Sequence, residues 1–383
     1  MSDDGAAKPK PAQPSPTALR LALLIPGGLA LLAGLDAALL LLGVGAPVTV
    51  GRLADVHGML MVYGFVGTLV ALERAVALSK LWGFLAPASL GLGGLALIFV
   101  EPSWIGGVLL AFGSAMLIAV YVPLWQRNSA TAVLVQAAGA VLALGGAILF
   151  ASGVPIPYLL PWLAGYLILT IGGERLELAR VAFAVGNAEA GALVACAGIW
   201  LAVPASLLWP TAGYRVLGGA LLVFTVWLIV YDIARRTVRS TGLTRFSAVC
   251  LLAGYFWLLI AGGIWLVVGP VRDGTGYDAS AHAVFLGFVM SMIFAHAPII
   301  LPAVLRRPLP YHPVMYVPAV VLHATLLLRI VVGDGADQLW AVTAGGIGNV
   351  VAVLLFVVIA IGSVLMTPRV KSKPEPSKQE ATA

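Results

Sequence analysis

Histidine is the residue type in this chain best suited to holding a metal, and the chain has only five: His57, His282, His296, His312 and His323. A neutral imidazole is the commonest metal ligand in proteins. All of them except His312 fall inside long apolar stretches. Ionisable side chains in such stretches are costly and are functional by default. The histidines are therefore the first candidates for chemistry in this protein.

His57 and His282 occupy matching positions in two separate apolar stretches. His57 comes four residues after the start of the stretch 53–78, and His282 comes three residues after the start of 279–303. At a rise of 1.5 Å per helical residue, both lie about 5 Å below one membrane face. Two imidazoles at matched depth on different helices can ligate one metal from opposite sides. The alternative is that each histidine caps a helix end or hydrogen-bonds a loop.

Small residues follow His57 along the same stretch. Gly64 and Thr68 come seven and eleven residues later, which places them on roughly the same face of a helix as His57. We expect this face to let a flat macrocycle lie against the backbone.

His296 and His323 are candidates for a second metal site. His296 follows His282 by fourteen residues, which at 100° per residue returns it to within about 40° of the same helix face. His323 lies near the middle of the stretch 313–332, and Pro298 can bend the helix of His296 toward it. Copper and non-haem iron are the candidate metals for such a site. The alternative is that both are hydrogen-bonded interior histidines.

Charged residues near the depth of His296 fall in two other apolar stretches. Such groups should pair, because an unpaired charge at that depth is costly. One hypothesis makes the carboxylates a proton path or ligands of a metal beside His296, and the other makes the whole set an ion-pair network between helices. The set consists of Glu73 and Arg74 in LVALERAVAL, and of Glu174, Arg175 and Glu177 in IGGERLELAR.

The elements that must position these residues are membrane-spanning helices. The 383 residues are 61% hydrophobic and 10% Asp, Glu, Lys and Arg, whereas soluble chains are about 45–50% apolar and about 25% charged. One span needs roughly 20 apolar residues, and the chain repeats stretches of this length. The composition excludes a cytoplasmic enzyme, a secreted disulfide scaffold and a nucleic-acid binder. The lipid bilayer is the expected environment.

Twelve apolar stretches predict twelve transmembrane helices in one all-α bundle. Their connections are too short for a soluble domain, and lipid forbids open strands. The termini, 1–17 and 367–383, lack periodicity and are expected to be disordered tails around a transmembrane domain that covers 18–366. The stretches lie at 18–44, 53–78, 82–100, 104–125, 130–152, 155–178, 187–203, 213–233, 246–268, 279–303, 313–332 and 338–366.

The distribution of lysine and arginine predicts the orientation of the bundle. If both chain ends are cytoplasmic (N-in/C-in), all but four of the 22 basic residues fall on the inner side, which fits the positive-inside rule. The four outer residues are Arg52, Arg215, Arg272 and Arg329. An even number of spans is required by the same arrangement.

Two segments resemble the NnrS family, twelve-span membrane proteins described as binding haem and copper and linked to nitric-oxide stress. They are ADVHGMLMVYGF, with His57, and SAHAVFLGFVMSMIFAHAPIILPAV, with His282 and His296, together about 40 residues. More distantly, they resemble subunit I of the haem-copper oxidases, in which histidines on the second and tenth helices hold a low-spin haem near the outer face. The resemblance implies that His57 and His282 are axial haem ligands in a bacterial inner-membrane protein.

Arg329 is the first candidate to neutralise the propionates of such a haem. It lies six residues beyond His323, toward the face where the paired histidines are expected, and its span assignment buries it. The alternative is that Arg329 snorkels to the interface or pairs with Asp334 or Asp337.

The chain departs from the oxidase pattern in its sixth and seventh stretches, which contain no histidine for the usual copper centre. The tenth stretch lacks a His-x-His pair for a second haem, and no CxxCH motif is present for covalent attachment, so a b-type haem is expected. Two axial histidines leave no open coordination position and favour electron transfer, with an unidentified electron donor. The resemblance adds redox chemistry related to nitric oxide.

A secondary transporter without a cofactor is the rival hypothesis, because twelve helices with buried charges also describe such carriers. A carrier built from repeats is expected to show similar halves. The segments 18–178 and 187–366 show no convincing similarity, and nothing in the second repeats HGMLMVYGF.

Overall fold

Twelve helices in the computed structural model are long and apolar enough to cross a membrane, which confirms the predicted all-α transmembrane bundle. The structure describes residues 16–182, 187–305 and 308–366, and these contain no β-strand. The segments expected to be disordered tails lie outside the described residues, apart from Pro16 and Thr17, which begin the first helix. Multi-pass insertion in a membrane follows from the length and apolar character of the spans.

The limits of the spans agree with the sequence prediction to within a few residues. The largest differences are at the seventh span, which ends at Leu208 and not at 203, and at the tenth, which begins at Gly274 and not at 279. The tenth helix is longer because the polar segment before 279 is already helical. The spans consist of α1 (Pro16–Leu41), α2, η1 and α3 (Arg52–Met59, Leu60–Gly67, Thr68–Leu78), η2 and α4 (Leu81–Phe84, Leu85–Phe99), α5 (Trp104–Asn128), α6 (Thr131–Ala151), α7 (Ile156–Ala182), α8 (Asn187–Leu208), α9 (Pro210–Tyr231), α11 (Gly242–Val267), α12, η3 and α13 (Gly274–His282, Ala283–Met290, Ser291–Leu305), η4, α14 and η5 (Pro313–Met315, Tyr316–Leu327, Leu328–Asp334) and α15 (Leu339–Met366), while the short α10 (Ala234–Thr237) connects α9 to α11.

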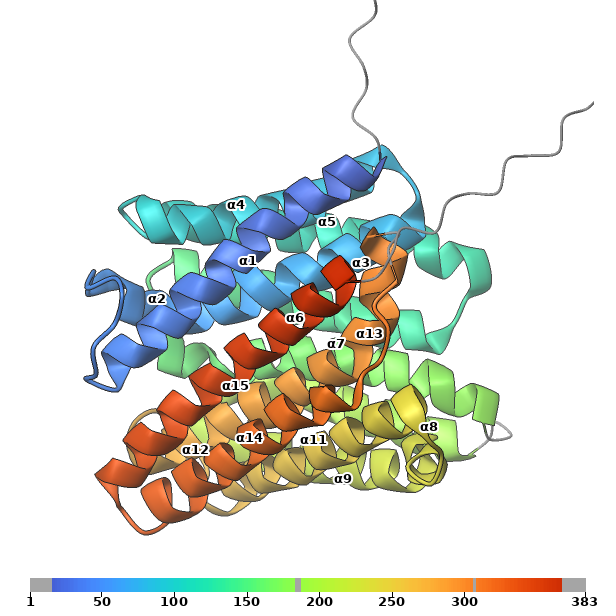
Figure 1. The fold of residues 1–383 in the computed structure, drawn as a ribbon. Coiled ribbons are helices and arrows are strands. Elements are labelled where there is room, and N and C mark those ends of the chain that lie inside the picture. The colour runs from blue at the N-terminus through green and yellow to red at the C-terminus, as the bar shows by residue number, and fades with distance from the viewer. Residues whose placement is uncertain (1–15, 183–186, 306–307, 367–383) are drawn as a thin grey trace, which may run out of the picture.

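The helices run side by side through the bundle, and α1 starts on the same side on which α15 ends (Figure 1). This agrees with the even number of spans. Helices α2 and α12 both begin on the opposite side of the bundle. Which of the two sides is cytoplasmic stays a prediction from the basic residues.

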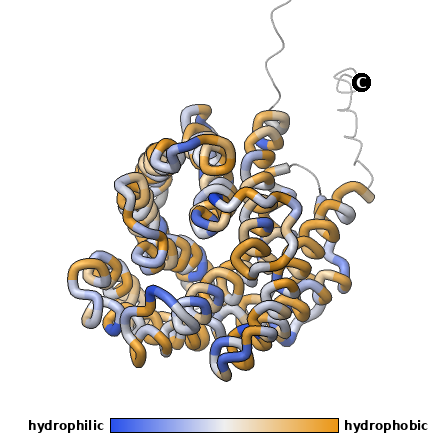
Figure 2. Tube along the Cα trace, turned by 90° about the vertical axis from the view of Figure 1, so that its left-hand side faces the viewer, coloured by the Kyte–Doolittle hydropathy of each residue, from blue (hydrophilic) through white to orange (hydrophobic). Residues whose placement is uncertain are grey.

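Apolar side chains cover the outside of the bundle. Figure 2 views the end at which α2 and α12 begin and shows mostly hydrophobic helices with hydrophilic segments among them. Large aliphatic residues on different helices point outward, with Val194 73%, Leu201 61% and Val320 62% exposed. Contiguous apolar surface of this kind marks contact with lipid.

Glycines let the helices on the N-terminal side of the bundle approach closely. A Cβ on Gly64 of η1 would lie 3.3 Å from the Cα of Gly94 in α4, and a Cβ on Gly27 of α1 would lie 3.5 Å from Cγ2 of Thr68. Gly64 and Thr68 therefore pack against α1 and α4. His57 also faces α1, because its Nδ1 lies 2.8 Å from the carbonyl oxygen of Gly34, so the three residues share a face as expected although η1 is π-helical. The expectation that this face leaves room for a flat macrocycle is wrong, because Ala30 and Gly94 fill the space beside Gly64.

Candidate functional site

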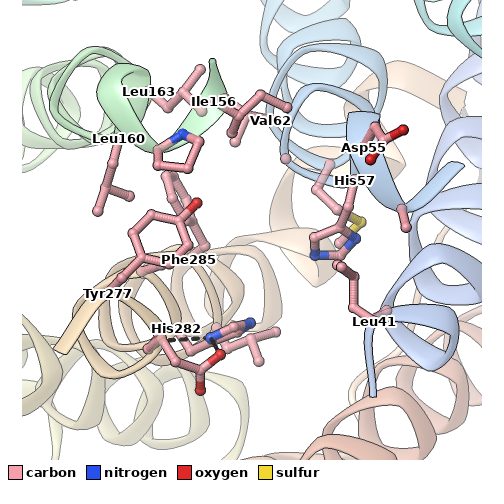
Figure 3. Close-up of a pocket in the computed structure, with 18 of the residues that line it drawn as sticks. Leu41, Asp55, His57, Val62, Ile156, Leu160, Leu163, Tyr277, His282 and Phe285 are labelled. Carbon is pink, nitrogen blue, oxygen red and sulfur yellow. Dashed lines mark hydrogen bonds and ion pairs between the residues drawn. The ribbon is translucent and has the colours of Figure 1, made fainter. Parts of the chain in front are cut away.

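A cavity of about 760 Å³ lies at the end of the bundle where α2 and α12 begin. This volume is in the range of about 300–1,000 Å³ that is typical of small-molecule and cofactor sites. The wall is mainly apolar and comes from the end of α1, from α2 and η1, and from α7, α12, η3, η5 and α15. Figure 3 shows His57 and His282 reaching into this space from two different helices, with Leu160 and Phe285 among the apolar lining.

His57 is oriented by the backbone of a neighbouring helix. Its Nδ1 lies 2.8 Å from the carbonyl oxygen of Gly34 in α1. A carbonyl can only accept, so Nδ1 carries the proton and Nε2 keeps the lone pair. No hydrogen-bond partner of Nε2 is found among the described residues. This is how proteins orient an imidazole that ligates a metal through Nε2.

His282 is oriented by Asp278, one helical turn earlier in α12. Nδ1 of His282 lies 2.8 Å from the Asp278 carbonyl oxygen and 3.2 Å from its Oδ1. Nδ1 is again the donor, which leaves Nε2 with the lone pair. Both histidines therefore present the same nitrogen, and both line the same cavity.

Arg329 lines the cavity and forms a two-bond contact with Asp278. Its Nε lies 2.7 Å from Oδ2 and its Nη2 lies 2.6 Å from Oδ1, and Arg329 is only 7% exposed. Neither Asp334 nor Asp337 takes this place. Sequence reasoning missed Asp278, although its spacing of four residues from His282 was an available signal.

Three polar residues of the cavity lie beside or within π-helical stretches. His57 comes shortly before η1, His282 directly before η3, and Arg329 belongs to η5. The i→i+5 bonds are seen in the backbone, for example from the amide of Gly335 to the carbonyl of Ile330 at 2.8 Å. In the described part of the chain, π-helix occurs in these three stretches and nowhere else. Such stretches are rare and are frequent at functional sites.

Gly346 of α15 gives the cavity room beside Arg329. A Cβ at this position would lie 3.0 Å from Nη1 of Arg329 and 2.6 Å from Cδ1 of Leu42. Glycine is therefore the residue that allows the guanidinium to lie against α15 and still reach Asp278.

The other two buried histidines are engaged by protein side chains. Nε2 of His296 lies 2.7 Å from Nη2 of Arg175, and its Nδ1 lies 2.6 Å from the carbonyl of Met292. Trp257 Nε1 donates to Nδ1 of His323 at 3.0 Å, and Ser291 Oγ lies 3.4 Å from its Nε2. All four ring nitrogens thus have partners, as the alternative of hydrogen-bonded interior histidines requires. The two histidines have separate partners, and a metal site shared by His296 and His323 stays a prediction.

The carboxylates of α3 and α7 gather around Arg74. The Nη2 of Arg74 contacts Oε1 of Glu73 and lies 3.6 Å from Oε1 of Glu174, while its Nη1 lies 3.5 Å from Oε1 of Gln136. Glu177 is exposed. The predicted ion-pair network between these two spans is therefore present. Its role as a proton path stays a prediction.

Replacing Glu174 with glutamine tests the hypothesis that this carboxylate is a metal ligand. Because Glu174 contacts Arg74 and not a histidine, we expect unchanged iron and copper contents and an unchanged visible spectrum. Elemental analysis of the purified variant beside the wild type checks this. A loss of either metal to less than half would contradict the structural role.

The described residues contain no group of three or more His, Cys, Asp or Glu side chains that could hold a metal ion. A pair of imidazoles is too few for an all-protein metal site, which usually takes four ligands. It is the number that a macrocycle with its own four nitrogens requires. The donor set of the cavity therefore fits a haem better than a bare metal ion.

Fold and cavity together define a multi-pass helical membrane protein with two imidazoles directed into one apolar chamber. The chain belongs to the family described as Domain of unknown function (DUF8744), whose profile matches residues 20–365. No curated protein and no solved structure matches the chain.

Proposed function

We propose that the protein binds a b-type haem between His57 and His282 and transfers electrons. One observation carries this proposal: two histidines on different helices share an apolar cavity, and each has its Nδ1 held by a protein acceptor so that Nε2 is left for a metal. The resemblance of the two histidine segments to NnrS proteins and to oxidase subunit I supports the same choice of cofactor.

The residues of the cavity fit a haem in chemistry as well as in size. His57 and His282 would supply the two axial nitrogens, and the apolar wall would cover the ring and exclude water. Arg329 has five N–H donors, of which two are directed at Asp278, so others remain for a propionate. A bound haem supplies a one-electron couple of its iron.

With His57 and His282 both bound, a haem iron would have no open position, and the site would exchange electrons with one-electron carriers instead of binding a gas. The link to nitric oxide that the resemblance implies would then need one of the two histidines to be displaced. The cavity lies on the side of the bundle opposite to the start of α1 and the end of α15, which is the outer side if the N-in/C-in prediction holds. We propose a place in a bacterial inner membrane on these grounds.

A reduced-minus-oxidised absorbance spectrum of the detergent-purified protein tests the proposal, with haem supplied during expression and total iron measured. We expect a sharp low-spin haem spectrum with about one iron per chain. The spectrum should be lost in the double variant His57→Ala/His282→Ala. It should be retained in His312→Ala, because His312 is exposed and its side chain accepts a bond from the amide of Val314, away from the cavity.

Either of two results would overturn the haem proposal. One is a colourless, iron-free wild type expressed with adequate haem. The other is a double variant with the full wild-type spectrum, which would place the haem elsewhere. A colourless wild type would leave the transporter hypothesis to be tested by substrate flux in vesicles.

A further inference from the structure

We propose that the ion pair of Asp278 and Arg329 sets the reduction potential of the site through His282. Asp278 is the positioning residue, whose carboxylate polarises the imidazole of His282. The positive charge of Arg329 offsets part of the carboxylate charge and so limits this polarisation. This inference rests on the proposed haem function and adds a device that regulates it.

The contacts form a chain from the guanidinium to the axial nitrogen. Arg329 holds both carboxylate oxygens of Asp278 at 2.6 and 2.7 Å. Oδ1 of Asp278, the oxygen that Nη2 contacts, also lies 3.2 Å from Nδ1 of His282. The side chains of Asp278 and His282 are 25% and 21% exposed, and Arg329 is nearly buried. Charges in such a poorly hydrated place interact more strongly than charges in water.

His57 lacks a matching arrangement. Its Nδ1 bonds to the neutral carbonyl of Gly34, and no carboxylate contacts it among the described residues. Asp55 lines the same cavity close to His57, but Asp55 is exposed and its charge is screened by solvent. The two histidines are therefore electronically unequal as ligands for a haem, since only His282 has a charged partner.

A carboxylate beside an imidazole N–H makes the opposite nitrogen a stronger donor. A stronger donor stabilises the ferric state, as does a nearby negative charge. Reduction adds one electron to the iron, and this electron comes from a one-electron donor. Asp278 should therefore lower the reduction potential, and the positive charge of Arg329 should raise it.

A redox titration with dithionite and soluble mediators, read from the haem spectrum, tests the inference. Asp278→Asn is expected to shift the reduced-to-oxidised equilibrium about tenfold toward the reduced form, which corresponds to about +59 mV for one electron. Arg329→Gln is expected to shift it in the opposite direction. Because both variants break the same ion pair, a purely structural role predicts shifts of the same sign.

Asp55→Asn is the matched control, since it removes the same charge at the rim of the cavity beside the other histidine. We expect its shift to be less than about one third of that of Asp278→Asn, measured in mV. If Asp278→Asn loses its haem, the direction for Arg329→Gln decides: a fall supports the inference, and a rise or no change overturns it.

The outcomes separate this inference from the haem proposal beneath it. A wild type without haem overturns both. The other case is a wild type whose haem spectrum depends on His57 and His282. If the potentials of Asp278→Asn and Arg329→Gln then equal that of the wild type, or shift with the same sign, only the inference about Asp278 and Arg329 is overturned.

Discussion

Replacing His282 with alanine is expected to lower the haem-to-protein ratio more than about 100-fold. Loss of a residue that only hydrogen-bonds a metal ligand costs about 10- to 100-fold in affinity, and loss of the ligand itself should cost more. His57→Ala is expected to retain part of its haem in a high-spin form. The two variants should differ because the two histidines are held differently. Nδ1 of His282 has two acceptors on Asp278, and Arg329 in turn holds the Asp278 carboxylate. His57 depends on one bond to another helix. Pyridine haemochrome analysis of both variants measures the difference.

Carbon monoxide distinguishes the two variants further. Reduced His57→Ala should bind it, because the loss of one imidazole opens a position on the iron, whereas the reduced wild type should not. A change of the Soret band on addition of the gas reports binding, and nitric oxide can be added in the same way. Equal loss of haem in both variants, or binding of carbon monoxide to the wild type, would contradict the asymmetry.

Replacing Arg175 with methionine should destabilise the folded protein by about 3–5 kcal/mol, the cost of breaking a buried pair from one side. Arg175 and Asp232 are 4% and 1% exposed, and Nη1 lies 3.9 Å from Oδ2. Tyr255 donates to the same Oδ2 at 2.7 Å, so the carboxylate would keep one side-chain partner and lose its counter-charge. His296 would lose the partner of its Nε2. Thermal unfolding in detergent, followed by circular dichroism, measures the change.

Arg52→Met is the control for this prediction. Arg52 pairs with Glu101 at 3.6 Å, but the two side chains are 29% and 72% exposed, so we expect a loss below about 1 kcal/mol. The double variant Arg175→Met/Asp232→Asn should be more stable than Arg175→Met alone, because it leaves no buried charge without a partner. Equal losses for Arg175→Met and Arg52→Met would show that the buried pair contributes little.

The sequence was sufficient to predict the number of spans and the two histidines that share the cavity. Apolar length fixes the spans, because lipid leaves few other solutions. His57 and His282 could be paired because both fall within a few residues of a span that begins on the same side. Counting along a helix is reliable over one or two turns, and these residues need no more than that.

Predictions that depended on how the helices pack were less successful. Gly64 and Thr68 face α1, as His57 does, but Ala30 and Gly94 fill the space beside Gly64, and neither Gly64 nor Thr68 lines the cavity. The spacing of residues along one helix does not show what packs against its small residues. Asp278 was also missed as the partner of Arg329, since Asp334 and Asp337 are near Arg329 in sequence while Asp278 lies on another helix. Which carboxylate pairs with Arg329 depends on how the helices pack, and a single sequence does not reveal this packing.

The π-helical stretches have a consequence for how the spans can vary. An i→i+5 turn holds one residue more than an α-helical turn, so a one-residue deletion within Leu60–Gly67 can be absorbed by conversion of the stretch to α-helix, whereas a deletion in a continuous α-helix rotates everything after it by about 100°. His57 lies before this stretch, and Glu73 and Arg74 lie after it. A deletion of one residue in this stretch would therefore leave His57 and the charged residues facing their present partners, and the span can lose a residue here without changing either end.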